Sequence, residues 1–264
     1  MSDKENSLFD THVHLDIISP VIEDELLLAR QEGIGTFLVP GVDRSGWSRL
    51  VDLCKGTDGA WAAPGLHPQH ADQWNPEAAR SLERLCDEPQ VIAIGEIGLD
   101  HTLLCSPSRH EQERVFVAQL RLAIEAQLPV VIHCRNAIGP LLDFLKRERA
   151  DRIGGILHGF SGSLESARQA ADLGFAIGLG APLTYPEARK APKIGRDLDP
   201  EWLVLETDAP DRAPHPYRGQ TNRPCWLLLV AKALAELRGW NLEKTAVVTS
   251  ANARRVLGLG GKQT

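Results

Sequence analysis

Short apolar, β-branched runs alternate with longer helix-like stretches along the whole 264-residue chain. This alternation is typical of βα units built around a parallel sheet. We expect eight strands, at Leu8–Leu15, Gly33–Val42, Ala60–Pro68, Val91–Asp100, Pro129–Arg135, Gly154–Ser161, Phe175–Gly180 and Trp202–Ala209. Eight strands that are each followed by a helix, in one chain of this length, favour a (β/α)8 TIM barrel over an open doubly wound sheet.

The sequence contains no linker or low-complexity run that would divide it into domains. An α/β barrel ordinarily spans ~200–250 residues as one unit. We therefore expect a single barrel domain over residues 1–264, with a polar N-terminal tail at 1–7 and a C-terminal tail at 259–264. The clearest predicted helix is Arg109–Gln127, whose apolar residues recur at helical spacing.

Charge and cysteine usage limit the class of protein. The formal net charge of −6 argues against a protein that coats duplex nucleic acid, so any contact with nucleic acid must be local. The five cysteines are odd in number and form no C-x-x-C pair, which favours a reducing compartment. No stretch approaches the ~18 consecutive apolar residues of a membrane span. These features predict a cytoplasmic protein. We further expect a monomer or weak homo-oligomer.

Ligand-type side chains stand at the carboxyl ends of the predicted strands. The first strand ends in Asp10–His14, DTHVH, where the two-residue period of a strand directs both imidazoles to one side. Glu96 interrupts an apolar run on the fourth strand, where an unpaired carboxylate would be costly to bury. His133, His158 and Asp208 end the fifth, sixth and eighth strands. Chemistry in such a barrel gathers at these ends, so the side chains should converge.

Four histidines and two carboxylates exceed the four ligands that close a structural zinc site. They suit two divalent ions with open positions for water and substrate. The expected ligands are His12, His14, Glu96, His133, His158 and Asp208. We expect Glu96 to bridge, with His12, His14 and Asp208 on one ion and His133 and His158 on the other. Mixed nitrogen and oxygen ligation suits Zn, Mn, Mg or Co.

Further residues are candidates for catalysis and substrate binding. Asp208 is expected to orient or deprotonate the attacking water. His67, at the end of the third strand, either binds phosphate, protonates the leaving oxygen or anchors its loop. Arg135, two residues beyond His133, is a candidate to hold a phosphate oxygen in its planar fork. Asn222 and Arg223 either extend that contact or are surface or ion-paired residues.

Three carboxylates are expected to support the ligands rather than bind metal. Asp10 and Glu206 stand two residues before His12 and Asp208, so the strand period turns them inward one layer deeper. We expect them to hold ligand tautomers or loops in place. Asp100, four residues beyond Glu96, is expected to have a structural role.

In chain order, a set of motifs resembles the TatD-type metal-dependent hydrolases, often described as deoxyribonucleases. The motifs are DTHVHLD (Asp10–Asp16), GLHP (Gly65–Pro68), IGEIGLD (Ile94–Asp100), LPVVIHCR (Leu128–Arg135), HGFSGS (His158–Ser163), LETDAP (Leu205–Pro210) and NRP (Asn222–Pro224). They extend over nearly the whole chain. The forms HGFSGS, ETDAPD and NRP are more similar to a YjjV-like branch than to the HCFSG and NEP pattern of many other members. The resemblance implies a TIM barrel with a binuclear metal site on the six residues named above.

The same resemblance implies phosphodiester hydrolysis, with 3′-to-5′ exonuclease action on single-stranded DNA as the expected activity. A related branch acts on D-aminoacyl-tRNA esters, which is one alternative. Asn136 stands where Asp often follows the strand-five arginine, and Cys225 follows NRP where Glu is frequent. Neither departure removes a ligand, and both bear on the choice of substrate.

Two other classes of protein are alternatives. Small-molecule amidohydrolases, deaminases and phosphotriesterases also use H-x-H on the first strand and Asp on the eighth. Their binuclear forms usually bridge the metals with a carbamylated lysine, whereas Glu96 occupies that place here. The second class is a non-catalytic protein that keeps the barrel as a scaffold. A barrel that had lost its activity should have its metal-ligand residues substituted first, and all six are present here.

Overall fold

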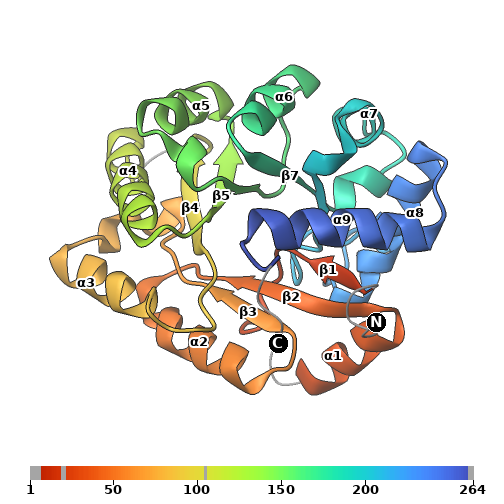
Figure 1. The fold of residues 1–264 in the computed structure, drawn as a ribbon, viewed down its shortest axis with the longest axis horizontal. Helices are drawn as coiled ribbons and strands as arrows, with labels where there is room; N and C mark the ends of the chain where they lie inside the picture. Colours follow the sequence, from red (N-terminus) through yellow and green to blue (C-terminus); the bar gives the residue numbers. More distant parts are fainter. Residues whose placement is uncertain (1–6, 19–21, 104–105, 261–264) are drawn as a thin grey trace.

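The computed structural model describes residues 7–18, 22–103 and 106–260. Within them, parallel strands form a barrel and α-helices surround it (Figure 1). The strands are β1 (Leu8–Asp10), β2 (Ile34–Pro40), β3 (Ala60–Ala63), β4 (Ile94–Asp100), β5 (Val130–Arg135), β6 (Gly155–Leu157), β7 (Phe175–Leu179) and β8 (Leu203–Leu205). The helices are α1 (Ile22–Gln31), α2 (Trp47–Gly56), α3 (Pro76–Leu85), α4 (Arg109–Ala126), α5 (Ile138–Arg147), α6 (Leu164–Asp172), α7 (Lys190–Asp197), α8 (Leu227–Arg238) and α9 (Leu242–Val256). The predicted (β/α)8 barrel is confirmed.

Backbone hydrogen bonds at two seams join the ladder β1–β2–β3 to the ladder β4–β5–β6–β7–β8. At one seam, the Gly41 N–H donates to the Gly95 carbonyl (2.8 Å) and the Glu96 N–H donates to the Gly41 carbonyl (2.9 Å). At the other, the Asp208 N–H donates to the His12 carbonyl (2.8 Å). Three of the six predicted ligands therefore lie on the seams, where closure of the barrel fixes their backbone.

Several strands are shorter than the sequence predicts, because the chain leaves the ladder where the ligand residues begin. β1 ends at Asp10 rather than Leu15, and β8 ends at Leu205 rather than Ala209. His12 and His14 therefore lie in the irregular segment that follows β1. The prediction that strand alternation orients the two imidazoles was wrong, although the bend brings both rings to the same site.

The interior of the barrel is filled by a compact apolar cluster. Its members on the strands are Phe9, Leu38, Ala63, Val131, Ile156, Ala176 and Val204. Ala253 and Leu257, at the carboxyl end of α9, belong to the same cluster. In Figure 1, α9 crosses in front of the strands and so covers one end of the barrel. The ligand side chains lie at the opposite end, where the strands finish.

Local structure bears on one predicted helix and on part of the predicted tails. The predicted helix Arg109–Gln127 is confirmed as α4, which Ser108 caps and Gln127 ends in a left-handed conformation. Of the predicted tails, residues 1–6 and 261–264 lie outside the described residues. Ser7 and Leu259 are described and packed, since the Ser250 hydroxyl donates to the Ser7 carbonyl and Leu259 joins the interior cluster.

Two further findings concern the state of the cysteines and the length and polarity of the helices. The four cysteines in the described part of the chain are free thiols, and Cys105 lies outside it. Across residues 7–18, 22–103 and 106–260, no helix is both long and apolar enough to cross a bilayer.

Gly98 in β4 is required for the close approach of β4 and β5. Its φ is +146°, and a Cβ at this position would overlap the His133 carbonyl oxygen. We expect Gly98→Ala to lower the free energy of unfolding by about 2–4 kcal/mol, because it adds strain and a clash between two strands. Gly139→Ala is the matched control, since a Cβ there meets nothing within 4 Å. Denaturant unfolding of both variants measures the difference, and equal stability would contradict this packing.

Candidate metal centre

The six predicted ligands converge at the carboxyl end of the barrel, and His67 joins them from the segment after β3. Three groups of these residues place ligand atoms within 4.8 Å of one another. They are His12 with His14 and Asp208, His12 with Glu96 and His158, and His67 with Glu96 and His133. The structure thus brings together every residue that the sequence predicted as a ligand. It groups His158 with His12, and Nε2 of His158 also lies 3.4 Å from Nδ1 of His133, its predicted partner.

The first group lies around one oxygen of Asp208. Nε2 of His12 is 3.7 Å and Nε2 of His14 is 3.8 Å from Asp208 Oδ1. The two imidazoles meet edge to face, with ring centroids 5.0 Å apart. Two ring nitrogens and a carboxylate oxygen thus face a common point. This is the arrangement expected of three protein ligands that share one cation.

Glu96 connects the other two groups because its two oxygens face different histidines. Oε1 lies 2.6 Å from His158 Nε2, 2.8 Å from His133 Nδ1 and 3.9 Å from His67 Nε2. Oε2 lies 3.4 Å from His12 Nε2. Each oxygen therefore points to a separate set of nitrogens, as a bridging carboxylate would require.

Several buried ring nitrogens at this site lack a hydrogen-bond partner among the described residues. They include both nitrogens of His12, Nδ1 of His14 and Nδ1 of His158. Leaving a buried polar atom unpaired costs about 1–3 kcal/mol, so such atoms ordinarily indicate a missing ligand. Imidazole nitrogens beside ionised carboxylates suit borderline divalent cations such as Zn²⁺, Mn²⁺ or Co²⁺. The residues present therefore fit metal binding.

The electrostatics of the site favour a cation. Burial alone would raise the pKa of Glu96, but His158 and other neighbouring histidines hold it well below its usual value. Burial works to lower the pKa of His133, yet its hydrogen bonds to Asp100 and Glu96 outweigh this and raise the pKa to about 9. Burial lowers the pKa of His67 to about 3. At neutral pH the metal-free site thus holds an ionised Glu96, a protonated His133 and a neutral His67.

Asp100 is a residue of the site that the sequence analysis assigned only a structural role. Its Oδ2 lies 3.3 Å from His133 Nε2, and its Oδ1 accepts a hydrogen bond from the Thr102 N–H (2.8 Å). Asp100 therefore orients the His133 ring, whose other nitrogen faces Glu96. The signal was present in the sequence, because the two-residue period places Glu96, Gly98 and Asp100 on one side of β4.

Asp10 holds the segment that carries Asp208. It is fully buried, and it accepts hydrogen bonds from the Thr207 N–H (2.9 Å), the Thr207 hydroxyl (2.5 Å) and the His12 N–H (3.3 Å). Burial raises the pKa of Asp10 to about 8 despite these hydrogen bonds. Asp10 thus ties the backbone after β1 to the backbone after β8, next to two predicted ligands.

Glu206 supports the segment that follows β6. Its Oε1 accepts a hydrogen bond from the Gly159 N–H (2.5 Å) and lies 3.8 Å from Nδ1 of His158. Its Oε2 is buried without a partner in the described structure. Burial raises the pKa of Glu206 to about 7. Asp10 and Glu206 therefore lie behind the ligands, as the sequence predicted.

The predicted substrate-binding residues are placed differently from one another. Nδ1 of His67 accepts a hydrogen bond from the Gln69 N–H (3.1 Å), so this ring anchors its loop and also faces Glu96. Arg135 ends β5 with an exposed side chain. The Asn222 amide is buried and donates to the carbonyls of Thr207 (2.7 Å) and Asp211 (2.8 Å).

Arg223 is directed away from the centre. Its Nε lies 3.0 Å from both carboxylate oxygens of Glu25 in α1. Asn222 therefore holds the loop after β8, and Arg223 joins that loop to α1. Arg223 thus has the ion-paired role that was its alternative to phosphate binding, whereas the buried Asn222 supports its loop, a role that the sequence analysis did not assign.

Glu206 should make the stability of the metal-free protein depend on pH. Its folded pKa of about 7 exceeds the usual value of 4.5, so the stability it contributes is present below pH 4.5 and is lost as pH rises through 7. Glu206→Gln should therefore gain about 1–3 kcal/mol relative to the parent protein across that window. Urea unfolding in a chelator measures this gain. Glu165→Gln, on the exposed face of α6, is the matched control, and a gain independent of pH would contradict the assignment.

Comparison with known proteins agrees with these observations. Residues 9–258 match the family described as TatD related DNase. The chain is 36% identical to YabD of Bacillus subtilis, named an uncharacterized metal-dependent hydrolase, over 94% of this chain and 98% of that protein. It is also 36% identical to a Cronobacter sakazakii protein named 3′-5′ ssDNA/RNA exonuclease TatD, over 88% of this chain and 90% of that protein.

A solved structure shows the same relationship. The crystal structure of YjjV, a TatD homologue from Escherichia coli, superposes with a TM-score of 0.88 at 34% identity, over 97% of this chain and 98% of that one. The resemblance that the sequence motifs predicted is therefore confirmed in both sequence and fold. The chain belongs to the TatD family of metal-dependent hydrolases.

Proposed function

We propose that this protein is a phosphodiesterase that uses two divalent metal ions to shorten single-stranded DNA from its 3′ end. The observation that carries the proposal is Glu96, whose Oε2 faces His12 while its Oε1 faces His133 and His158. A two-metal centre of this kind is suited to in-line displacement at a phosphate. The Cronobacter relative named as a 3′-5′ ssDNA/RNA exonuclease supports the substrate and the polarity.

The chain offers a ligand set for each ion. His12, His14 and Asp208 would hold one, and Glu96 would connect it to a second held with His133 and His158. When bound, such a pair lowers the pKa of a coordinated water and neutralises charge on the phosphate. Zn, Mn, Mg and Co are the candidate metals.

Asp208 is placed to position the attacking water. Its Oδ1 faces His12 and His14, and its Oδ2 lies 3.6 Å from Nε of Arg212 at the rim of the site. The side chain is 13% exposed, so it lies at the opening of the site. A partly exposed carboxylate beside the other ligands can orient or deprotonate water.

His67 is suited to bind the phosphate rather than to protonate the leaving oxygen. The Gln69 N–H donates to Nδ1 of His67, which therefore carries no proton. In the neutral ring the proton lies on Nε2, the nitrogen that faces the centre. Because the pKa of His67 is lowered to about 3, the ring is a neutral hydrogen-bond donor at physiological pH.

The environment of the protein stays a prediction. Four free cysteines are consistent with a reducing compartment, in agreement with the proposed cytoplasmic location. We also propose a monomer or weak homo-oligomer.

The proposal is tested with metal-free protein that is resupplied separately with Mg, Mn, Zn and Co. The substrates are 3′-labelled and 5′-labelled single-stranded DNA and a small phosphodiester. We expect metal-dependent stepwise shortening from the 3′ end. Asp208→Asn should reduce kcat by about 100-fold or more, because it removes the group that positions water.

Asp172→Asn, on the exposed face of α6, is the matched control and should retain full activity. Equal turnover by Asp208→Asn would exclude the role of Asp208. Hydrolysis of the small ester with intact DNA would keep the metal centre and reject the nuclease. The search would then turn to D-aminoacyl-tRNA and to small-molecule amides and esters.

A further inference from the structure

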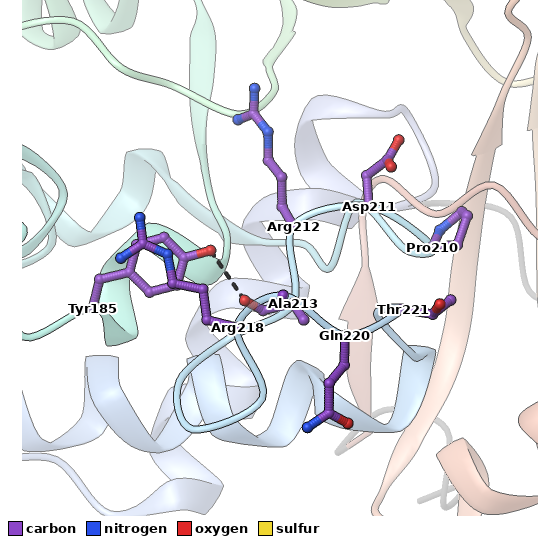
Figure 2. Close-up of a pocket in the computed structure, with 9 residues that line it drawn as sticks. Tyr185, Pro210, Asp211, Arg212, Ala213, Arg218, Gln220 and Thr221 are labelled. Carbon is purple, nitrogen blue, oxygen red and sulfur yellow. Dashed lines mark hydrogen bonds between the residues drawn. The ribbon is translucent and has the colours of Figure 1, made fainter.

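The loop that joins β8 to α8 contains a cavity of about 350 Å³ next to the metal centre. Its lining includes Tyr185, Asp211, Arg212, Arg218 and Gln220. The same loop carries Asp208, so the cavity and the metal centre share one segment of chain. Figure 2 shows Arg212 extending from one side of this loop and Arg218 lying over the ring of Tyr185. Neither the family match nor the named relatives assign a role to this cavity.

Arg212 reaches from the cavity to the edge of the metal centre. Its Nε lies 3.6 Å from Asp208 Oδ2, and its side chain is 40% exposed. A Cβ at Gly159 would lie 3.3 Å from Nη1 of Arg212. Since Gly159 directly follows His158, the guanidinium spans the rim between two predicted ligands while one face stays open to solvent.

Arg218 forms a fixed wall of the cavity. Its guanidinium carbon lies 4.4 Å from the centroid of the Tyr185 ring, and it forms an ion pair with Glu187. The Tyr185 hydroxyl donates to the Ala213 carbonyl (3.0 Å), which fixes the ring against the loop (Figure 2). Tyr185 and Glu187 are thus the two partners of the Arg218 side chain on this side of the cavity.

The charge balance favours an anion at Arg212. A cation bound by His12, His14 and Asp208 would take up the charge of the carboxylate with which Arg212 pairs. The guanidinium would then be available to a second negative group. Because the whole chain has a net charge of −6, a polyanion must find its favourable contacts at local sites of this kind.

We propose that Arg212, next to the wall formed by Arg218, binds the phosphodiester adjacent to the one that is cleaved. The planar fork of an arginine matches two phosphate oxygens, which a lysine cannot reproduce. Asp211 also lines the cavity, and its carboxylate lies on the other side of the loop from Arg218 (Figure 2). This phosphate subsite at Arg212 rests on the proposed function. It would favour substrates that carry more than one phosphate.

Binding of a strand that resists hydrolysis tests the subsite directly. The probe is fluorescein-labelled dT8 with phosphorothioate linkages, which keep the backbone charge, measured by anisotropy across a salt series in the presence of the activating metal. Loss of one phosphate contact should reduce the slope of log affinity against log salt by about 0.7. Arg212→Gln should show this smaller slope and bind about tenfold more weakly at low salt. Arg212→Lys should keep the slope but lose part of the affinity.

Arg168→Gln, which removes an exposed charge from the outer helix α6, is the matched control and should match the parent protein. An unchanged slope and affinity in Arg212→Gln would overturn the subsite. So would a parent protein that does not bind the probe. A parent protein that binds the probe but never cleaves unmodified dT8 would reject the nuclease, while the salt slopes still decide the subsite.

Discussion

The buried carboxylate of Glu96 is the group around which the site is organised. It is 3% exposed, and an unpaired negative charge at that depth would be strongly destabilising. Its side chain contacts histidines from the segments after β1 and β6 and from β5, and its backbone N–H closes a seam of the barrel. One residue thus joins the closure of the fold to the convergence of the ligands. A change at Glu96 would disturb both.

Topology made the ligand set predictable from the sequence. In a parallel barrel all strands finish at the same end, so an apolar run followed by a ligand-type residue fixes where that residue lies. His133, His158 and Asp208 could be placed by this rule alone. The prediction needed no knowledge of the distances between strands, because the barrel supplies the convergence.

The details that escaped prediction depend on contacts between distant parts of the chain. The bend after β1 is held by Asp10 and Thr207, which are 197 residues apart. Arg223 pairs with Glu25 over 198 residues, and no local pattern marks that partner. Arg212 lies in an irregular loop, where periodicity gives no direction. Asp100 differs, because its place on β4 followed from the strand period and was overlooked.

The interior cluster and α9, which together close one end of the barrel, limit the path that a substrate can take. The barrel is filled with side chains from Phe9 to Val204, and Ala253 and Leu257 seal its far end. A chain molecule therefore cannot thread through the barrel as through a ring. Whatever the substrate is, it enters and its products leave by the same opening. Substrate entry and product release therefore compete at the carboxyl end of the barrel.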